Sequence, residues 1–339
     1  MPLCLDAVLI VVLALVIDRF IGEVPNSVHP LRWMGNILGA MDRRIRNRTS
    51  RATSVMGFLA YVLVFLLFSG LGLLITSFMR IGVGELVSPA AGEILWIVST
   101  AVLFKVSFAV FSFRDHVEPI CSDIEAGDID GADAKVQMIV SRDTRGMDAE
   151  HVTSSCCETI SENLVDSVYS PVLYFGLLGL PGAVMFRCAN LMDAMWGYLN
   201  ERYGRLGFFP AKFDDVLGFL TSRVSPYFIA LAGMSMGMDW RRAVPAAREE
   251  HSKTPSPNSG WSMTATAAVL GISMEKRGVY VMGTGPLPTT DDVRRCYRLI
   301  ERSSMLFMLT VGLVCYLLLG VHVQVFFEDL LFGFWGSVL

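Results

Sequence analysis

Long apolar runs alternate with polar segments along the whole of this 339-residue chain. A helix needs about 20 apolar residues to cross the ~30 Å hydrocarbon core of a bilayer, and several runs approach or exceed that length. The pattern therefore predicts membrane helices rather than a soluble core. The runs extend from Leu3 to Ile17, Val55 to Met79, about Ile94 to Phe113, 168 to 189, Val216 to Met238, and Met305 to about Phe334.

One of these runs is interrupted in a way that predicts a broken helix, and a second run is weakened by a charged residue and a proline. The run at 168–189 contains Gly176, Gly179, Pro181 and Gly182, and the run at 216–238 contains Arg223 and Pro226. Irregular backbone at membrane depth is tolerated where it lines a cavity or is buried in protein. Leu3 to Ile17 is short for a crossing, and we interpret it as a retained helix because no basic region precedes it and no cleavage site follows.

Composition supports the membrane assignment. Apolar residues make up 53% of the chain, charged residues only 18%, and the mean hydropathy is +0.50. We therefore predict an all-α, polytopic integral membrane protein with about 4–6 membrane helices, some broken or re-entrant, and with helical cytoplasmic loops. The chain is expected to form a single integral membrane domain, residues 1–339, in the cell membrane.

The distribution of arginine and lysine predicts which segments face the cytoplasm. Residues 18–54 and 239–304 are rich in these residues, and the positive-inside rule places both on the cytoplasmic side. The polar segment 114–165 should lie on the same side, because a two-helix hairpin separates it from the first loop. An even number of crossings must also separate it from the third loop, so 168–189 and 216–238 either both span or both re-enter.

The most conspicuous polar pattern is an acidic one, Glu158-Thr-Ile-Ser-Glu162-Asn163-Leu-Val-Asp166. Positions four apart share one face of a helix, so the three carboxylates should form an acidic ridge with Asn163 beside it. Like charges repel at this spacing, and the repulsion grows where an apolar run draws the helix into low dielectric. A divalent metal ion or arginine side chains should therefore face the ridge; the alternative is a solvated acidic face.

A second polar constellation follows the broken run and comprises Asn190, Asp193, Asn200 and Glu201. Asp193 and Asn200 share a face with Asn190 if the helix continues through Gly197. Ionisable residues within apolar sequence are costly unless they are paired or line a polar cavity, which makes them functional candidates. The alternative is that Asp193 reaches the membrane surface. A further carboxylate pair is Asp214-Asp215.

Three polar stretches in the loops are weaker candidates. Arg142-Asp143-Thr144-Arg145 offers two guanidinium groups and a hydroxyl suited to phosphate or carboxylate, although it also reads as an ordinary helix start. Ser256-Pro-Asn258-Ser-Gly260-Trp261 reads as a turn by composition. His29 lies in a rigid loop beside Pro30, where a lone histidine is usually structural.

Several functions are not supported by any pattern. The seven cysteines include no Cys-x-x-Cys pair, and the histidines show no His-x-x-x-His spacing, so neither a disulfide framework nor a zinc site is expected. No basic patch interleaved with aromatics suggests nucleic acid. There is no Walker A motif, no Gly-x-Gly-x-x-Gly after a strand, and no Gly-x-Ser-x-Gly.

Taken together, the polar stretches resemble those of the integral-membrane adenosylcobinamide-phosphate synthases, the CobD/CbiB family of cobalamin biosynthesis. Two departures concern loops: Gly22-Glu23-Val24-Pro25 stands where many members read Gly-Asp-Pro, and Pro286-Leu-Pro288 follows Gly283. The matching stretches cover most of the chain in the family's order: Asp18 to Gly35; Arg142-Asp-Thr; Glu158-Thr-x-x-Glu-Asn-x-x-Asp166-Ser; Asn190-x-x-Asp193-x-Met-x-Gly-Tyr-x-Asn-Glu-Arg-Tyr203; Asp214-Asp215; and Ser256-Pro-Asn-x-Gly-Trp261.

The resemblance implies an ATP-dependent ligase that joins a carboxylate of the corrinoid adenosylcobyric acid to the amine of aminopropanol or its phosphate, with Mg²⁺. An acyl phosphate would be the activated donor. Membrane lipid and other membrane enzymes of cobalamin assembly are the further expected partners. The active site is expected on the cytoplasmic side.

The resemblance marks positions, and the roles given to them here are hypotheses. Glu158, Glu162, Asp166 and Asp193 would hold Mg²⁺. Arg142 and Arg202 would bind phosphate or carboxylate groups, and Asp214 or Asp215 would take a proton from the attacking ammonium. The other expected substrate-binding residues are Asp143, Thr144, Asn163, Asn190, Asn200, Glu201, Asn258, Trp261 and His29.

Two other functions are compatible with parts of the pattern. A magnesium-dependent membrane transferase of the prenyl type also carries Asn and Asp on broken helices, but it should have two similar halves with Asp-rich motifs, which this chain lacks. A transporter would use Asp193 and Glu162 as coupling sites and should show paired repeats. Here most of the conspicuous polar residues lie in or beside loops, which favours the ligase.

Overall fold

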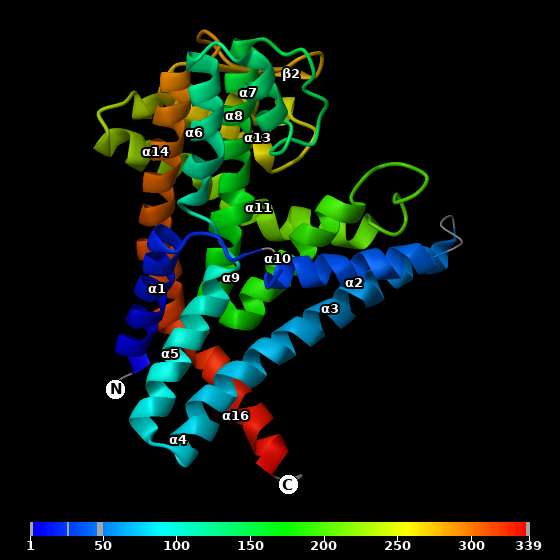
Figure 1. Ribbon diagram of the computed structural model, residues 1–339, viewed down its shortest axis with the longest axis vertical. Helices are drawn as coiled ribbons and strands as arrows, with labels where there is room; N and C mark the ends of the chain where they lie inside the picture. Colours follow the sequence, from blue (N-terminus) through cyan, green and yellow to red (C-terminus); the bar gives the residue numbers. More distant parts are fainter. Residues whose placement is uncertain (1–2, 26, 46–49, 337–339) are drawn as a thin grey trace. The chain divides into compact units, whose positions relative to one another are not determined.

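The computed structural model describes residues 3–25, 27–45 and 50–336, and the chain is almost entirely helical there (Figure 1). Arg46 and Arg48 of the first basic loop lie outside the described residues. Chain contacts divide the protein into two compact units. Unit 1 comprises Met1–Ala109, Ser170–Leu217 and Leu309–Leu339, and unit 2 comprises Val110–Tyr169 and Gly218–Met308. That the whole chain forms one membrane domain stays a prediction.

Unit 1 is built from apolar helices, several of which are broken. Its main contacts pair α1 with α5, α3 with α10, α9 with α10 and α3 with α16. The elements are α1 Leu3–Phe20, α2 Pro30–Arg44, α3 Arg51–Ser77, η1 Phe78–Gly82, α4 Val83–Leu86, α5 Pro89–Lys105, α9 Ser170–Leu178, α10 Leu180–Trp196, α15 Leu313–Cys315, η6 Tyr316–Gly320 and α16 Val321–Gly336.

Unit 2 surrounds α8 (Ala149–Leu164), which packs against α14 (Thr290–Phe307), α13 (Ser259–Leu270) and strand β1 (Ser273–Lys276). Strand β1 pairs with β2 (Tyr280–Gly283) in an antiparallel hairpin, a small addition to the predicted all-α fold. The remaining elements are α6 Ser112–Glu125, α7 Ile129–Val136, η2 Val165–Tyr169, η3 Trp240–Arg242, α12 Ala243–Glu250 and η4 His251–Lys253. Helix α11 (Phe208–Ser235) and the turn η5 (Met308–Gly312) connect the units.

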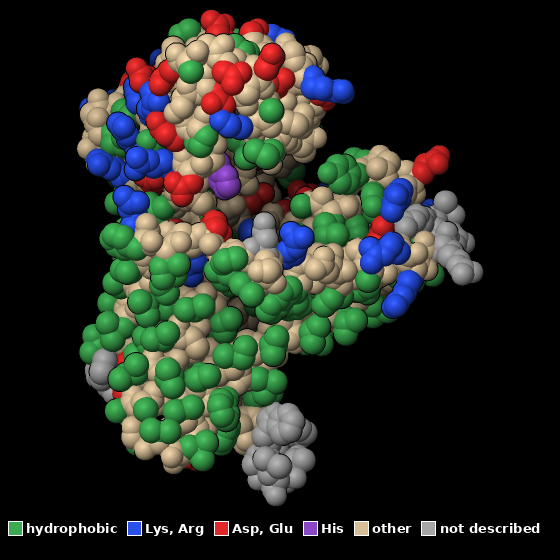
Figure 2. All heavy atoms as spheres, in the orientation of Figure 1, with side chains coloured by type: hydrophobic (Ala, Val, Ile, Leu, Met, Phe, Trp, Pro, Cys, Tyr) green, Lys and Arg blue, Asp and Glu red, His purple; other side chains and the backbone are tan. Residues whose placement is uncertain are grey.

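The predicted membrane character is confirmed. Three helices within the described residues are long and apolar enough to cross a membrane, spanning Arg51–Leu86, Phe208–Ser235 and Thr290–Gly333. The face of unit 1 shown in Figure 2 is covered mostly by hydrophobic side chains, whereas acidic and basic side chains are frequent on the face of unit 2 shown there. On α3, for example, Leu59, Leu63 and Leu66 are exposed, as lipid contact requires.

The interrupted run at 168–189 is broken as predicted. Helix α9 ends before Gly179, whose φ of 67° lies in the left-handed region that favours glycine, and α10 begins immediately afterwards with Pro181 in its first turn. The expected helix at 94–113 is shorter than predicted, because α5 ends at Lys105. Lys105 is buried and its Nζ lies 3.0 Å from Asp18 Oδ1, so the chain ends this helix on an ion pair.

Candidate functional site

The acidic ridge lies in unit 2, on α8 and the turn that follows it. Asp148 begins α8 as its N-cap, accepting a hydrogen bond from the His151 amide at 2.9 Å. The helix ends at Leu164 and continues as the wider π-helical turn η2, which carries Asp166. π-Helical turns within helices occur frequently at functional sites. The ridge thus spans two kinds of helical turn, where the sequence predicted one continuous α-helix.

Arg142 faces the ridge, as the electrostatic argument requires. Its Nη1 donates to Glu158 Oε1 at 2.5 Å and its Nη2 donates to Ser155 Oγ at 2.7 Å. Glu158 is only 4% exposed, so this is a buried ion pair. Ser155 precedes Glu158 by three residues and shares its helix face, so its part in the site was available from spacing alone.

The charges of Glu158 and Asp166 act on the third carboxyl group of the ridge, that of Glu162. Burial, then the charges of Asp166 and Glu158, raise the pKa of Glu162 to about 7, while Lys276 and Arg142 act in the opposite direction. The ordinary value is 4.5. At this value Glu162 is partly protonated at neutral pH, which reduces the repulsion between the carboxylates. Carboxyl groups in this condition are typical of functional sites.

The β-hairpin brings two residues to the ridge that the sequence did not indicate. Lys276 and Tyr280 are cross-strand partners, and the Lys276 ammonium lies 6.0 Å from the centre of the Tyr280 ring. Burial and the nearby Glu158 and Glu162 carboxylates raise the pKa of Tyr280. The hairpin is anchored to α8, because the Glu275 amide donates to Ser154 Oγ at 2.8 Å. More than a hundred residues separate the two elements in sequence, so no local pattern could reveal this contact.

The neighbours of Arg142 in sequence do not reach the ridge. Asp143 accepts hydrogen bonds from the guanidinium and the backbone amide of Arg145, which lower its pKa to about 2, and both side chains are exposed. Thr144 is buried, and its amide donates to Gln137 Oε1 at 3.0 Å. Asn163 is also engaged locally, donating to the Thr159 carbonyl at 2.9 Å. Of this group, Arg142 alone contacts a ridge carboxylate among the hydrogen bonds of the described residues.

Asn258 and Trp261 have structural contacts in unit 2. Asn258 Oδ1 accepts hydrogen bonds from Arg223 Nη1 at 2.6 Å and from Ser222 Oγ at 3.2 Å. The Trp261 ring stacks on His251 with a centroid distance of 4.1 Å. The Asn258 contacts join the start of α13 to α11, and the Trp261 contact joins it to η4.

A stability measurement checks this interpretation of Asn258. Replacing Asn258 by alanine removes the acceptor of a buried, charge-assisted hydrogen bond, which contributes roughly 1.5–3 kcal/mol. We expect a lower thermal unfolding midpoint for Asn258→Ala, measured by circular dichroism in detergent. An unchanged midpoint would contradict the structural role and leave substrate binding as the better account.

The second predicted constellation lies in unit 1 and is arranged differently from the prediction. Helix α10 ends at Trp196, so Asn190, Asp193 and Asn200 do not share one continuous helix face. The helix stops here because the Gly207 backbone packs against the Trp196 carbonyl; a Cβ at Gly207 would lie 1.8 Å from that oxygen. Asn200 and Glu201 are exposed beyond the helix end.

The remaining predicted residues of unit 1 lie in separate local contacts. Asn190 Oδ1 accepts from Arg187 Nη1 at 3.2 Å, and Arg202 Nη2 donates to Asp42 Oδ2 at 2.8 Å. Asp215 Oδ2 lies 3.0 Å from Lys212 Nζ, and both affect Asp193 electrostatically. The proton-acceptor role of Asp214 or Asp215 stays a prediction.

His29 caps α2 by accepting a hydrogen bond from the Leu31 amide through Nδ1 at 3.2 Å. Burial lowers its pKa, and the nearby Arg187 and Lys105 act in the same direction against Glu23. His29 is therefore neutral at pH 7 and beside two cations. Arg187 and Lys105 lie within apolar runs, and a charged residue in such a run is a functional candidate. The sequence analysis did not consider either residue.

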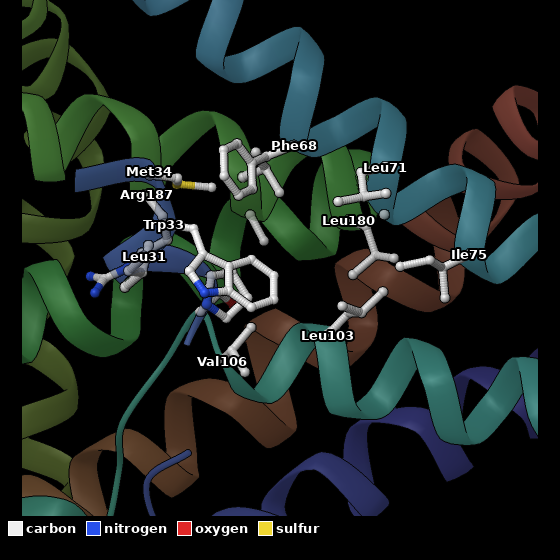
Figure 3. Close-up of a pocket in the computed structure, with 15 residues that line it drawn as sticks. Leu31, Trp33, Met34, Phe68, Leu71, Ile75, Leu103, Val106, Leu180 and Arg187 are labelled. Carbon is white, nitrogen blue, oxygen red and sulfur yellow. The ribbon is translucent and has the colours of Figure 1, made fainter. Parts of the chain in front are cut away.

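An apolar cavity of about 100 Å³, lined in part by Arg187, lies in unit 1 (Figure 3). Arg187 and Leu31 lie at one end, while Leu71, Leu103 and Leu180 lie at the other. Its lining is dominated by hydrophobic side chains from α2, α3, α5 and α10. The cavity is suited to a hydrocarbon group and lacks the carboxylates that the predicted chemistry needs.

The ridge offers Mg²⁺ fewer ligands than the sequence predicted. No three of the described His, Cys, Asp and Glu side chains lie close enough together to hold one metal ion. Asp193 lies in unit 1, whereas the other three predicted ligands lie in unit 2. Magnesium in phosphoryl-transfer sites is usually held by one or two carboxylates together with substrate phosphates and water. Glu162 and Asp166, whose charges interact, fit that smaller role.

Comparisons with known proteins agree with the motifs. The family described as CobD/Cbib protein matches residues 11–304. The "Probable cobalamin biosynthesis protein CobD" of Methanothermobacter thermautotrophicus is 36% identical over 284 residues, covering 82% of this chain and 88% of the relative. The protein of the same name from Pyrococcus abyssi is 35% identical over 308 residues, covering 89% and 96%.

A third relative with that name, from Methanococcus aeolicus, is 33% identical over 286 residues, covering 82% of this chain and 88% of its own. No solved structure matches the chain. The family match and the relatives, each aligned over most of its own length and most of this chain, point to the same family. The chain belongs to the CobD/CbiB family of cobalamin-biosynthesis proteins.

Proposed function

We propose that this protein is an ATP-dependent ligase that forms an amide between a carboxylate of adenosylcobyric acid and the amine of aminopropanol or its phosphate. The observation that carries the proposal is the ridge in unit 2, where Arg142 and Lys276 approach Glu158 and Glu162. Partly buried cations beside a carboxyl group of raised pKa, that of Glu162, suit a reaction that moves phosphate groups and protons.

The chemistry requires two steps. A substrate carboxylate oxygen attacks the terminal phosphorus of ATP, forming an acyl phosphate and releasing ADP. The amine nitrogen then attacks the acyl carbon, a C–N bond forms, inorganic phosphate leaves, and the nitrogen loses a proton. Phosphoryl transfer depends on positioning and on neutralising the charge of the phosphate oxygens, rather than on a protein nucleophile.

The residues of the ridge supply these functions. The Arg142 guanidinium is oriented by Glu158 and Ser155, and its Nε, which is buried and has no hydrogen-bond partner, leaves it a donor for a substrate oxygen. Lys276 offers a second positive charge on the hairpin. Glu162 and Asp166 would hold Mg²⁺, which when bound neutralises phosphate oxygens.

Reconstitution tests the proposal directly. Purified protein in detergent or nanodiscs is incubated with adenosylcobyric acid, ATP and Mg²⁺, together with either aminopropanol or aminopropanol phosphate. Mass spectrometry should detect the corresponding cobinamide product and an equal amount of ADP. Absence of product with both amines would overturn the proposal, and the comparison of the two identifies the preferred amine.

Metal dependence is a separate prediction. Removing divalent cations with EDTA should reduce product formation at least 100-fold, because the phosphate charges lose their counter-ion, and Mg²⁺ should restore it. Product formation is followed by mass spectrometry over a Mg²⁺ titration. Full activity in EDTA would exclude Mg²⁺ and remove the proposed role of Glu162 and Asp166.

A further inference from the structure

A group of arginine side chains in unit 1 lies where the end of α2, the start of α3 and the loop 197–207 come together. Arg43 and Arg44 end α2, Arg51 begins α3, and Arg205 lies in the loop. We call these four residues the arginine cluster. All four are exposed, and within the described part of the chain none of them has a hydrogen bond or an ion pair. Figure 2 shows basic side chains gathered near the end of α2.

Packing within unit 1 holds the three segments of the cluster together. Arg202 Nη2 donates to Asp42 Oδ2 at 2.8 Å, which ties the loop to the last turn of α2. The Leu206 carbonyl packs closely against Gly57 of α3, since a Cβ at Gly57 would lie 2.0 Å from the carbonyl oxygen. The loop is therefore fixed to both helices, and Arg205 is held on the same side of unit 1 as the other three arginines.

The exposed side chains of α3 place the cluster relative to a bilayer. Arg51 begins the helix, and Val55, the first exposed apolar side chain, follows one turn later. Exposed apolar side chains continue to Phe78, over ~35 Å of helix at 1.5 Å per residue, which is enough to cross the ~30 Å hydrocarbon core. Arg51 therefore lies at the depth of the lipid head groups. Gly57, where the loop packs, lies ~9 Å farther along the helix, at the edge of the hydrocarbon.

The loop exposes apolar side chains beside the cluster. Leu199 is 99% exposed, and Tyr198 and Phe208 are exposed as well. Elements that lie in the head-group region of a bilayer combine arginine or lysine with aromatic and leucine side chains in this way, because the basic groups meet phosphates while the apolar groups enter the acyl region. Both kinds of side chain occur together at this end of unit 1.

The acidic residues of these segments leave the surface positive. Asp42 is buried and accepts a hydrogen bond from Arg202. Glu201 is exposed and forms no ion pair with any arginine among the described residues. The four arginines of the cluster thus outnumber the one exposed acid of the loop, and a surface of this charge attracts groups of net negative charge.

We propose that the arginine cluster binds the head groups of anionic phospholipids, while Leu199 enters the acyl region beside them. Guanidinium groups form paired hydrogen bonds with phosphate oxygens, and a zwitterionic head group offers less net charge because it carries its own cation. Lipid fits better than a soluble acidic partner, because α3 places the cluster at head-group depth. The proposal does not depend on the ligase activity proposed above.

Lipid retention tests the preference. The protein is purified in detergent, mixed with equal amounts of phosphatidylglycerol and phosphatidylcholine that carry the same acyl chains, and examined by native mass spectrometry. Phosphatidylglycerol should be retained preferentially, and less so at high salt, because ions screen the contact. Arg43→Gln/Arg44→Gln should lower its retention roughly tenfold or more, since each basic residue near an anionic surface strengthens binding about fivefold.

Two further variants separate the charge from the apolar contact. Arg241→Gln/Arg242→Gln is the matched control, because it removes an adjacent pair of exposed arginines in unit 2, and it should leave retention unchanged. Leu199→Ser should lower the retention of both lipids by the same factor, because their acyl chains are identical. Circular dichroism checks the fold of each variant, and Arg205→Gln carries the test of charge if Arg43→Gln/Arg44→Gln does not fold.

Several results would overturn the proposal. One is equal retention of the two lipids by the unaltered protein, and another is an equal loss in the control and in Arg43→Gln/Arg44→Gln. A dimer in the same mass spectra that Leu199→Ser dissociates would assign the surface to a second copy of the chain in place of lipid.

Discussion

Replacing Glu162 by glutamine is expected to abolish amide formation while making the protein more stable at alkaline pH. Activity should fall at least 100-fold, because the variant loses a charge that would hold Mg²⁺ at the ridge. Glutamine keeps the size of the side chain, so a loss of activity would report the charge. Product is measured by mass spectrometry over a Mg²⁺ titration, and unchanged activity with unchanged metal dependence would contradict the role.

The gain in stability follows from the raised pKa of Glu162. The folded protein holds this proton to about pH 7, whereas the unfolded chain releases it near the ordinary value of 4.5. The folded state therefore binds more protons than the unfolded state between these values, and its stability decreases as the pH rises through that window. Above pH 7 the full cost of the buried charge remains, on the order of 1–3 kcal/mol.

A glutamine at this position does not ionise and avoids that cost. The thermal unfolding midpoint of Glu162→Gln should exceed that of the wild type at pH 8 and match it at pH 4, both without Mg²⁺. Glu150→Gln is the matched control, because Glu150 is exposed on the same helix. It should leave both activity and the midpoint unchanged. If the variant were less stable than the wild type at pH 8, the ionised Glu162 side chain would be stabilised by neighbouring cations more than it is repelled by Glu158 and Asp166.

Replacing Arg142 by alanine is expected to destabilise unit 2 and to abolish activity. The change leaves Glu158 buried without the guanidinium that neutralises it, and removing one partner of a buried ion pair costs about 3–5 kcal/mol. The unfolding midpoint should fall by several degrees, measured by circular dichroism in detergent. Activity should decrease more than 100-fold, because the substrate phosphate loses a donor as well.

Arg145→Ala provides a matched control three positions along the same loop. Arg145 and its partner Asp143 are largely exposed, and an exposed pair contributes little to stability. Stability and activity should therefore be close to those of the wild type. Glu158→Gln in the Arg142→Ala background should recover part of the lost stability but none of the activity. Equal effects of the two arginine variants would exclude the buried pair as the cause.

The sequence alone determined the membrane character and the acidic ridge. Length and hydropathy are properties of local runs, so the spans at Val55–Met79 and after Met305 were predictable, as was the break at Gly179. The ridge was predictable because helical spacing relates Glu158 to Glu162 within one turn. The need for a cation beside it followed from electrostatics, and the Arg142 stretch was a candidate by composition, but no local pattern paired Arg142 with Glu158.

The tertiary structure decided which partners meet, because those contacts join residues far apart in the chain. The approach of Lys276 and Tyr280 to the ridge depends on how a hairpin packs against α8. The end of α10 at Trp196, set by packing against Gly207, separates Asn200 from the face it would share with Asn190.

The pairing of α1 with α5 was likewise invisible in the sequence, where nothing relates Asp18 to Lys105. Local spacing reports which side chains share a helix face, whereas the pairing of faces depends on packing between helices. In this protein the sequence determined the charges of the ridge and the membrane segments, and the tertiary structure decided which of those charges lie beside an opposite charge.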